Sequence, residues 1–361
     1  MGQGALAPCP FLCYNGENKK GWEAMGATLA KRNLNSMDLC KLFMAMCVVA
    51  IHTRPMQNCK SDSIFAIYEL AVQLAVPFFF FSTGFLLASK FDPQNTAGNM
   101  AVVAAYLRRT VKLYFLWCLI YFPFSIYYYA TYRSGVSLVH MIASYVRCLL
   151  CIGGHYNAYQ LWYLLSTIYG LLLVMLLLRC KWSEKGWLAV MAAACALSLF
   201  MDWIAEYEGA LPAALRMVKL LVGYTTVDGR PLWGSFIIPA GMLMTKYRGS
   251  VKWNLLLFAF LSCLDFFVEN PEISTFLTFL RGAAFFTLVM AVQLKDHRLY
   301  PTLRKISTDM YLMHLYVWII YSALMDGEKR YGFDSFLVTT AACFAIGWLR
   351  HRPGRKIKAM K

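Results

Sequence analysis

Long apolar stretches alternate with short polar segments from residue 37 to residue 350. Ten of the stretches approach the length of about 17 to 25 residues that a helix needs to cross a bilayer. They cover about residues 37–56, 64–89, 110–131, 158–178, 185–204, 231–247, 251–269, 272–293, 304–325 and 334–350. The pattern predicts an all-α fold, a polytopic membrane bundle of about ten transmembrane helices.

The segments outside these stretches divide the chain into three parts. Residues 1–36 are polar and contain no secretory signal, which predicts a cytoplasmic N-terminal segment. Residues 37–350 form the predicted transmembrane domain, and residues 351–361 form a basic cytoplasmic tail. Within the domain, residues 132–157 predict an amphipathic helix at the outer membrane surface. Residues 205–230 predict an outer loop that contains a short helix.

The composition supports a membrane protein. Hydrophobic residues make up 59% of the chain and charged residues 15%, whereas soluble domains contain about 25% charged residues. The net charge of +16 follows the predicted topology, because 24 of the 35 Lys and Arg residues lie in segments that would be cytoplasmic and nine in segments that would be outside. This bias predicts that both termini are inside. It argues against nucleic-acid binding, because the positive charges form no single patch.

Three ionisable residues share the first predicted span. Asp38 and Lys41 lie near its cytoplasmic end, and His52 lies near its outer end. The spacing of Lys41 and His52 places them on one face of a helix, about 16 Å apart along its axis. A charge within a span costs at least about 2.5 kcal/mol, so these residues are candidates for function. Snorkelling to the membrane surface is the alternative for Asp38 and Lys41.

Arg281 lies in the middle of another predicted span. It is followed by Gly282 and two alanines, which allow close approach of a second helix. A buried guanidinium needs an acid or an anionic ligand, and Asp265 and Glu269 are candidates for a structural partner. Ligand binding and structural pairing are both open at this position.

His314 lies near the middle of the ninth predicted span. Ser307 precedes it by two helical turns and lies on the same face. Asp309 lies about 140° round the helix from His314, so it is not expected to orient the imidazole. A buried histidine that a neighbouring group satisfies is the alternative to a catalytic role.

The cysteines do not predict a metal site. The chain has 12 of them, and many lie in predicted spans, where cysteine acts as a small apolar filler. Cys148 and Cys151 form a C-x-x-C pair, but no second pair at zinc-binding spacing accompanies it.

Six short motifs, in order along the chain, resemble those of the membrane acyltransferase-3 family. In the first, "SMDLCKLFMAMCVVAIH", the family has a basic residue and a histidine that map onto Lys41 and His52. The family more often has Arg at the first position, and Lys keeps the charge but loses the bidentate fork. The other motifs are "VPFFFFSTGFLL" (76–87), "YLRRTVKLY" (106–114), "YQLWYLLSTIYGLLL" (159–173), "IIPAGMLM" (237–244) and "ISTDMYLMH" (306–314).

The resemblance implies an integral-membrane O-acyltransferase, multi-pass in the bacterial cytoplasmic membrane. Such an enzyme moves an acyl group, usually acetyl, from cytoplasmic acyl-CoA to a hydroxyl of a carbohydrate or cell-envelope acceptor at the outer face. His52 would accept the hydroxyl proton, and Lys41, Asp38 and His314 are further catalytic candidates. Acyl-CoA is expected as the donor substrate, with no tightly bound cofactor.

The resemblance also implies binding residues. The phosphates of CoA would meet basic side chains near the cytoplasmic side. The candidates for this role are Lys41, Arg108, Arg109, Lys112 and Arg281. The candidates for contact with the substrate are Trp162, Tyr163 and Ser307.

A second resemblance is to the membrane portion of vancomycin-resistance serine racemases, which belongs to the same broad family. The stretches "VPFFFF", "YQLWY" and "VDGRPLW" are similar to segments of that portion, which is associated with serine uptake. The alternative function is therefore a serine-like small-molecule transporter module. Pro77, Pro239 and Gly241 would be the helix breaks of such a transporter, although no internal repeat accompanies them.

Overall fold

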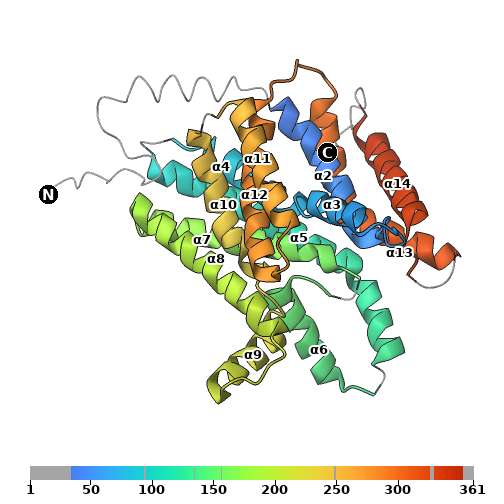
Figure 1. Ribbon diagram of the computed structural model, residues 1–361. Coiled ribbons are helices and arrows are strands. Elements are labelled where there is room, and N and C mark those ends of the chain that lie inside the picture. Colours follow the sequence, from blue (N-terminus) through green and yellow to red (C-terminus); the bar gives the residue numbers. More distant parts are fainter. Residues whose placement is uncertain are drawn as a thin grey trace, which may run out of the picture. The chain divides into compact units, whose positions relative to one another are not determined.

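The computed structural model describes residues 34–92, 95–133, 135–155, 157–247, 249–325 and 329–352. These residues form helices and their connections, with no strand among them, which confirms the all-α prediction (Figure 1). They fall into two compact units. The first unit contains residues 80–247 and 271–276, and the second contains residues 34–79, 249–270 and 277–352.

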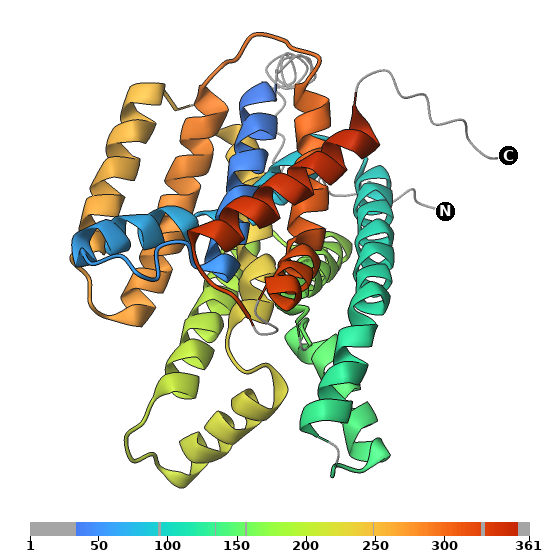
Figure 2. The same cartoon turned by 90° about the vertical axis from the view of Figure 1, so that its right-hand side faces the viewer.

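Three helices form the core of the second unit. They are α2 (Asn35–Thr53), α13 (Tyr300–Met325) and α14 (Phe333–His351), which pack along one another (Figure 2). Their apolar residues recur at helical spacing, so each helix buries one stripe against the other two. The buried contact consists of Leu42, Ala45, Val49, Ile306, Met310 and Cys343. This contact joins the first described helix to the last two.

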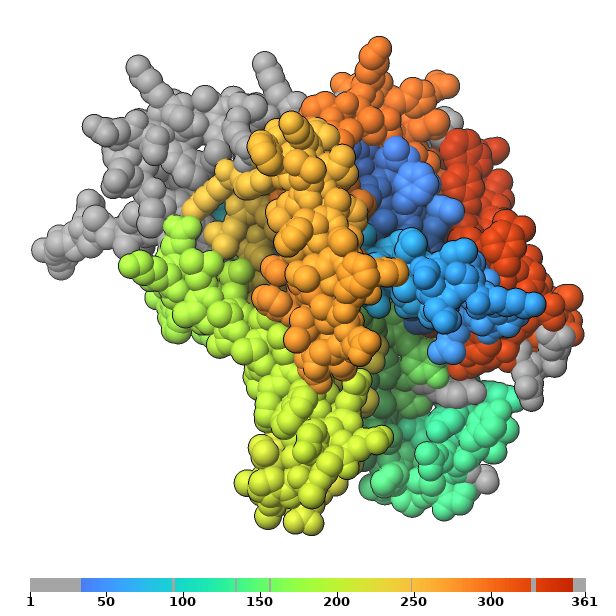
Figure 3. All heavy atoms as spheres, viewed as in Figure 1, coloured from blue at the N-terminus to red at the C-terminus, as the bar shows by residue number. Residues whose placement is uncertain are grey.

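Two further helices and parts of two others belong to the second unit. They are α3 (Asp62–Val72), α11 (Val251–Phe266), residues 75–79 of α4 (Ala75–Ala88) and the later part of α12 (Pro271–Ala291). The helix α11 is seen at the surface in Figure 3 (yellow-orange), and many of its apolar side chains are exposed. The exposed side chains include Trp253, Leu255, Leu256, Leu257, Phe260 and Leu264. A contiguous apolar surface of this kind is expected where a helix faces lipid.

Four helices form the core of the first unit: α5 (Thr96–Tyr132), α7 (Trp162–Arg179), α8 (Glu184–Glu206) and α10 (Trp233–Leu243). Glycine allows α7 and α10 to approach closely. A Cβ atom at Gly234 would lie 2.0 Å from the carbonyl oxygen of Ser166. The Gly234 amide also donates a hydrogen bond to Ser166 Oγ at 2.8 Å. Close backbone approach at small residues is typical of helix packing in membranes.

The helices differ in length from the predicted spans. The apolar stretch 64–89 forms two helices, α3 and α4 (Ala75–Ala88), and α5 begins at Thr96, well before the predicted start of its span. The helices α10 and α11 have 11 and 16 residues. Within the described residues, six helical segments are long and apolar enough to cross a membrane: Asn35–Thr53, Asp62–Ala88, Thr96–Tyr132, Tyr159–Arg179, Glu184–Glu206 and Pro271–Ala291. The total of ten spans and the inside location of both termini stay predictions.

Helices also form in the two segments that were predicted to lie outside the spans. They are α6 (Leu138–Arg147), which continues into a π-helical turn at Cys148–Ile152, and α9 (Ala213–Thr225). Their location at a membrane surface stays a prediction. Most of the predicted N-terminal segment and C-terminal tail lies outside the described residues.

Candidate active site

Two histidines face each other across the contact between α2 and α13. The ring centroids of His52 and His314 are 5.2 Å apart, and the ring planes are inclined by 33°. His52 is half-buried in the last turn of α2, and His314 is fully buried. Val49 and Met310, each about one turn before its histidine, pack in the core of the unit. This packing holds the two helices at the distance that brings the rings together.

Backbone contacts determine the tautomer of His314. Its Nδ1 atom lies 2.8 Å from the carbonyl oxygen of Tyr311 and 3.1 Å from that of Met310. Because a carbonyl oxygen can only accept a hydrogen bond, Nδ1 carries the proton. The Nε2 atom of the neutral ring is then an acceptor, and it is buried without a hydrogen-bond partner among the described residues. The His314 ring, which contacts the His52 ring, therefore has a buried lone pair on Nε2.

Asp38 and Lys41 lie at the opposite end of α2 from His52. Asp38 Oδ2 is 3.5 Å from Arg304 Nη1 on α13, and the Asp38 side chain is 8% exposed whereas that of Arg304 is 46% exposed. Lys41, one turn further along α2, is a second cation in electrostatic range of this carboxylate. The two predicted catalytic residues thus belong to a charged cluster at the start of α2 and α13.

Arg281 is satisfied by protein groups within the second unit. Its Nε atom lies 2.7 Å from Asp265 Oδ2, and both side chains are almost completely buried. This contact is a charge pair without the alignment of a hydrogen bond, since neither Asp265 oxygen accepts one from a described residue. The other guanidinium nitrogens donate to Leu70 O at 2.9 Å, Thr278 Oγ1 at 3.0 Å and Gln73 Oε1 at 3.4 Å. Of the two candidate acids, Asp265 is the one that pairs with Arg281.

The structure does not bring Ser307 or Asp309 to the imidazole of His314. The Ser307 hydroxyl donates to the carbonyl oxygen of Arg304 at 2.8 Å. Asp309 Oδ2 instead contacts Arg350 Nη1 at 3.0 Å and His351 Nε2 at 2.9 Å, both near the end of α14. The predicted separation of Asp309 from His314 is confirmed.

The connection between α13 and α14 is fastened to the end of α2. The Gly332 amide donates to the carbonyl oxygen of Thr53 at 2.8 Å. Arg54, the residue that follows α2, has φ of 48°. Its guanidinium carbon lies 5.2 Å from the ring centroid of Tyr331. The Tyr331 ring in turn contacts that of Trp318, with centroids 5.2 Å apart.

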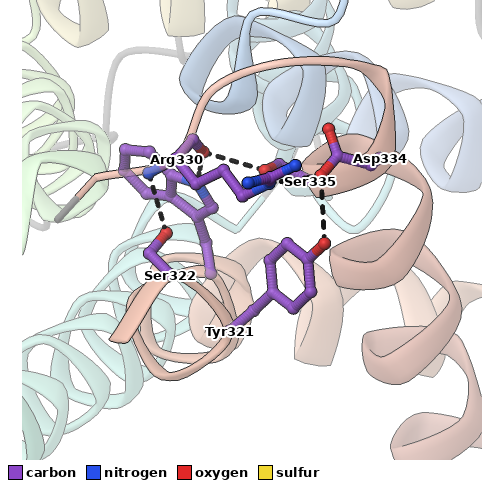
Figure 4. Close-up of polar contacts among 6 residues, drawn as sticks. Tyr321, Ser322, Arg330, Asp334 and Ser335 are labelled. Carbon is purple, nitrogen blue, oxygen red and sulfur yellow. Dashed lines mark hydrogen bonds and ion pairs between the residues drawn. The ribbon is translucent and has the colours of Figure 1, made fainter. Parts of the chain in front are cut away.

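Arg330 organises the same connection (Figure 4). Its amide donates to Ser322 Oγ at 3.1 Å, and its Nε atom lies 2.5 Å from Asp334 Oδ2. Tyr321 donates its hydroxyl to the same carboxylate oxygen at 3.0 Å, and the Ser335 hydroxyl donates to the Arg330 carbonyl oxygen at 2.8 Å. These bonds hold the beginning of α14 against the end of α13.

The remaining predicted ligands of acyl-CoA lie on α5, in the first unit. Arg108, Arg109 and Lys112 are exposed within about one turn of each other. The Arg109 guanidinium carbon lies 5.3 Å from the ring centroid of Tyr106. An exposed basic stretch of this kind can meet phosphate groups, because its guanidinium and ammonium groups are open to solvent.

The two aromatic substrate candidates lie at the start of α7. The Tyr163 ring packs on Phe80 at a centroid distance of 4.5 Å, and its hydroxyl is 3.3 Å from Thr83 Oγ1. The Trp162 ring meets that of Trp233 edge-on at 5.5 Å. The motifs around residues 80 and 162 therefore meet in one aromatic cluster of the first unit.

The described ranges contain no group of three or more His, Cys, Asp or Glu side chains that could hold a metal ion. The ten cysteines described there are free thiols.

Three residues of this unit had not been singled out from the sequence. Arg304 lies near the start of α13 beside Asp38, and Trp318 lies about one turn after His314, so helical spacing along α13 is a signal that could have found Trp318. Tyr331 lies in the connection after α13, and no periodic pattern reports where a connecting segment folds back.

Comparisons with curated proteins find amino-acid racemases of enterococci. An amino-acid racemase of Enterococcus faecalis is 34% identical over 149 residues, which cover 41% of this chain and 20% of the relative. A second from that species is 23% identical over 235 residues, covering 64% and 31%. A serine/alanine racemase of Enterococcus gallinarum is 26% identical over 301 residues, covering 78% and 40%. The chain therefore spans two fifths or less of the length of these relatives.

No solved structure matches the chain. The model of the acyltransferase domain family matches residues 34–349, which include both histidines, the charged cluster at the start of α2 and the basic stretch of α5. Because this match covers most of the chain, the protein belongs to the acyltransferase-3 family of acyltransferase domains.

Proposed function

We propose that this protein is an integral-membrane O-acyltransferase. It moves an acyl group, such as acetyl, from cytoplasmic acyl-CoA to a hydroxyl of a carbohydrate or cell-envelope acceptor at the outer face of the membrane. Family membership supports acyl transfer, and the six candidate spans among the described residues support a membrane location. The single observation that carries the proposal is the pair of imidazoles, His52 and His314, at 5.2 Å.

In this proposal His52 is the general base. Its neutral imidazole takes the proton of the acceptor hydroxyl as the hydroxyl oxygen attacks the thioester carbonyl carbon. The new C–O ester bond forms and the C–S bond breaks. The leaving thiolate of CoA takes up the proton from His52, which restores the neutral base.

His314 supports the base. Its Nδ1 proton is committed to backbone carbonyl oxygens, so only the Nε2 lone pair is available towards the site. A hydrogen-bond acceptor beside His52 stabilises the imidazolium that forms when the hydroxyl proton is taken. His314 is therefore a positioning residue in this mechanism.

The donor and acceptor meet further residues. Lys41, Arg108, Arg109 and Lys112 are the proposed partners of the CoA phosphates, because their charges suit a ligand with several phosphate groups. Arg281 has a structural role in this proposal, because its guanidinium already pairs with Asp265 and donates hydrogen bonds to Leu70 O and Thr278 Oγ1. The aromatic residues Trp162 and Tyr163 remain proposed contacts of the substrate.

The test is acetyl-CoA binding and CoA release by the purified protein in detergent. We expect His52→Ala to lower CoA release by about 100-fold or more, the scale of general-base catalysis, while acetyl-CoA still binds. His140→Ala is the matched control, because His140 is an exposed histidine on α6. Its turnover should equal that of the wild type.

Two results would contradict the proposal. One is the absence of acetyl-CoA binding by protein that is shown to be folded, and the other is CoA release that does not depend on His52. Uptake of labelled serine into vesicles that contain the protein would then test the transporter alternative.

A further inference from the structure

Arg54 occupies an unusual backbone position at the end of α2. Its φ of 48° and ψ of 59° are left-handed, and its amide donates to the carbonyl oxygen of Ala50 at 2.9 Å. Glycine or asparagine usually takes this position after a helix, because a larger side chain is strained there. An arginine at such a position needs a reason that lies in its side chain.

The guanidinium of Arg54 is exposed and forms no ion pair with a carboxylate of the described residues. Its carbon lies over the Tyr331 ring, and none of the ion pairs among the described residues includes it. Glu69 lies in electrostatic range without forming an ion pair. Arg330, which precedes Tyr331 in the connection between α13 and α14, differs from Arg54 because its Nε atom lies 2.5 Å from Asp334 Oδ2. The guanidinium N–H groups of Arg54 are therefore available to donate hydrogen bonds to a bound group.

Arg54 follows the end of α2 that carries His52. It follows His52 by two residues, a rise of about 3 Å along α2. Tyr331 links it to Trp318, which follows His314 by about one turn of α13. The bond from Gly332 to Thr53 fixes this connection at the end of α2. A group bound by Arg54 would thus lie at the end of α2 that carries His52.

We propose that Arg54 binds an anionic group of the acceptor, a carboxylate or a phosphate that lies close to the hydroxyl being acylated. The planar guanidinium offers paired N–H donors, which match the oxygens of either anion. The Tyr331 ring holds the guanidinium in place, because a cation is attracted to the face of an aromatic ring, and Trp318 packs on Tyr331. This inference rests on the proposed function, since it names the chemical class of that function's acceptor.

The test compares matched acceptors that differ in charge. CoA release from acetyl-CoA is measured in detergent with glycerol 3-phosphate against glycerol and with glucuronate against glucose. We expect the wild type to favour the anionic member of at least one pair by about 10-fold or more, the worth of hydrogen bonds to a charged group. Which pair responds tells phosphate from carboxylate.

Variants assign this preference to one side chain. Arg54→Gln should bring the preference close to unity, because the anionic acceptors lose their charged partner. Arg54→Lys should keep part of it, because the charge remains while the paired donors are lost. Arg330→Gln is the matched control. It should keep the full preference for the anionic acceptor, because the Arg330 guanidinium is paired with Asp334.

The outcomes separate this inference from the proposed function. Equal rates within both pairs, no stimulation by any of the four acceptors, or an anion preference that survives in Arg54→Gln would each overturn the inference. His52-dependent CoA release would still support acyl transfer in those cases. Equilibrium dialysis with labelled glycerol 3-phosphate and glucuronate supplies a readout that is independent of turnover. Binding of either anion that is lost in Arg54→Gln and kept in Arg330→Gln supports the inference, and binding of neither opposes it.

Discussion

The ring of His314 lies 5.2 Å from that of His52 and carries a buried lone pair on Nε2. If this lone pair stabilises the protonated base, His314→Phe should lower kcat for CoA release while KM for acetyl-CoA stays unchanged. The expected loss is about 10- to 100-fold, the worth of one hydrogen bond to a charged group. His314→Gln, which keeps a hydrogen-bond acceptor, should recover part of the rate. Equal rates for the Phe variant and the wild type would exclude a role for His314 in catalysis.

Lys41 tests whether charge or shape matters at the start of α2. Lys41→Arg keeps the positive charge near Asp38, whereas Lys41→Ala removes it. We expect a raised KM for acetyl-CoA with Lys41→Ala and a nearly normal one with Lys41→Arg, because the proposed role is to attract phosphate. The measurement is steady-state kinetics of CoA release. Similar kinetics for the two variants would show that charge at this position does not contribute.

The Arg281–Asp265 pair predicts a specific pattern of stability. Arg281→Met leaves a buried carboxylate without its counter-charge and should lower the free energy of unfolding by about 3–5 kcal/mol. The double variant Arg281→Met with Asp265→Leu should recover most of this loss, because no charge is then left buried. Thermal unfolding in detergent measures both. An Arg281→Met protein of normal stability with a raised KM for acetyl-CoA would favour ligand binding instead.

The glycine contact between α7 and α10 gives a matched pair of variants. In Gly234→Ala the new Cβ would lie 2.0 Å from the backbone oxygen of Ser166, so the helices must move apart and unfolding should occur at a lower temperature. In Gly223→Ala, within α9, the new methyl meets no atom within 4 Å. That change should leave stability unchanged or raise it slightly, because alanine favours a helix over glycine by about 1 kcal/mol. Equal melting temperatures in both variants would contradict the close packing.

His155, in the connection before α7, predicts a dependence of stability on pH. Its burial and the positive charge of Arg147 lower the pKa of His155 to about 4. The unfolded chain has a His pKa of about 6.5 and therefore binds a proton between these values when the folded protein does not. Stability should thus fall as the pH is lowered from about 6.5 towards 4.

The variant His155→Gln isolates this effect. It removes the titrating group, so the fall of the melting temperature in this pH window should be shallower than in the wild type. His140→Gln controls for the loss of an exposed imidazole. Parallel pH profiles for His155→Gln and the wild type would rule the effect out.

The helices themselves could be predicted from the sequence, because apolar runs of this length have few other stable forms in a membrane. The spacing along α13 also placed Asp309 away from His314, as the structure confirms. The meeting of His52 with His314 could not be derived in this way. Periodicity reports which face of a helix is apolar, but it does not report which other helix covers that face. Only the family resemblance had placed the two histidines in one site.

The break between α3 and α4 shows a second limit of the sequence. The stretch 64–89 is continuously apolar apart from a few polar positions, and Pro77 is the local signal for the break, because proline has no amide hydrogen to donate to the carbonyl oxygen of residue 73. The structure adds a tertiary contact there, because Gln73 Oε1 accepts hydrogen bonds from Thr278 and from Arg281. A contact with residues about 200 positions later leaves no trace in the local pattern.

The packing of α2 against α13 also affects how the protein is made. Ribosomes add about 5–20 residues per second, so roughly 12–50 s pass between the synthesis of Thr53 and that of Tyr300. During this time Asp38 lacks Arg304, and His52 lacks His314. The membrane insertion machinery therefore has to keep the first helix in the bilayer until the last two helices arrive. A ribosome that stalls before α13 would leave a polar first helix without its partners, which is a substrate for membrane proteases.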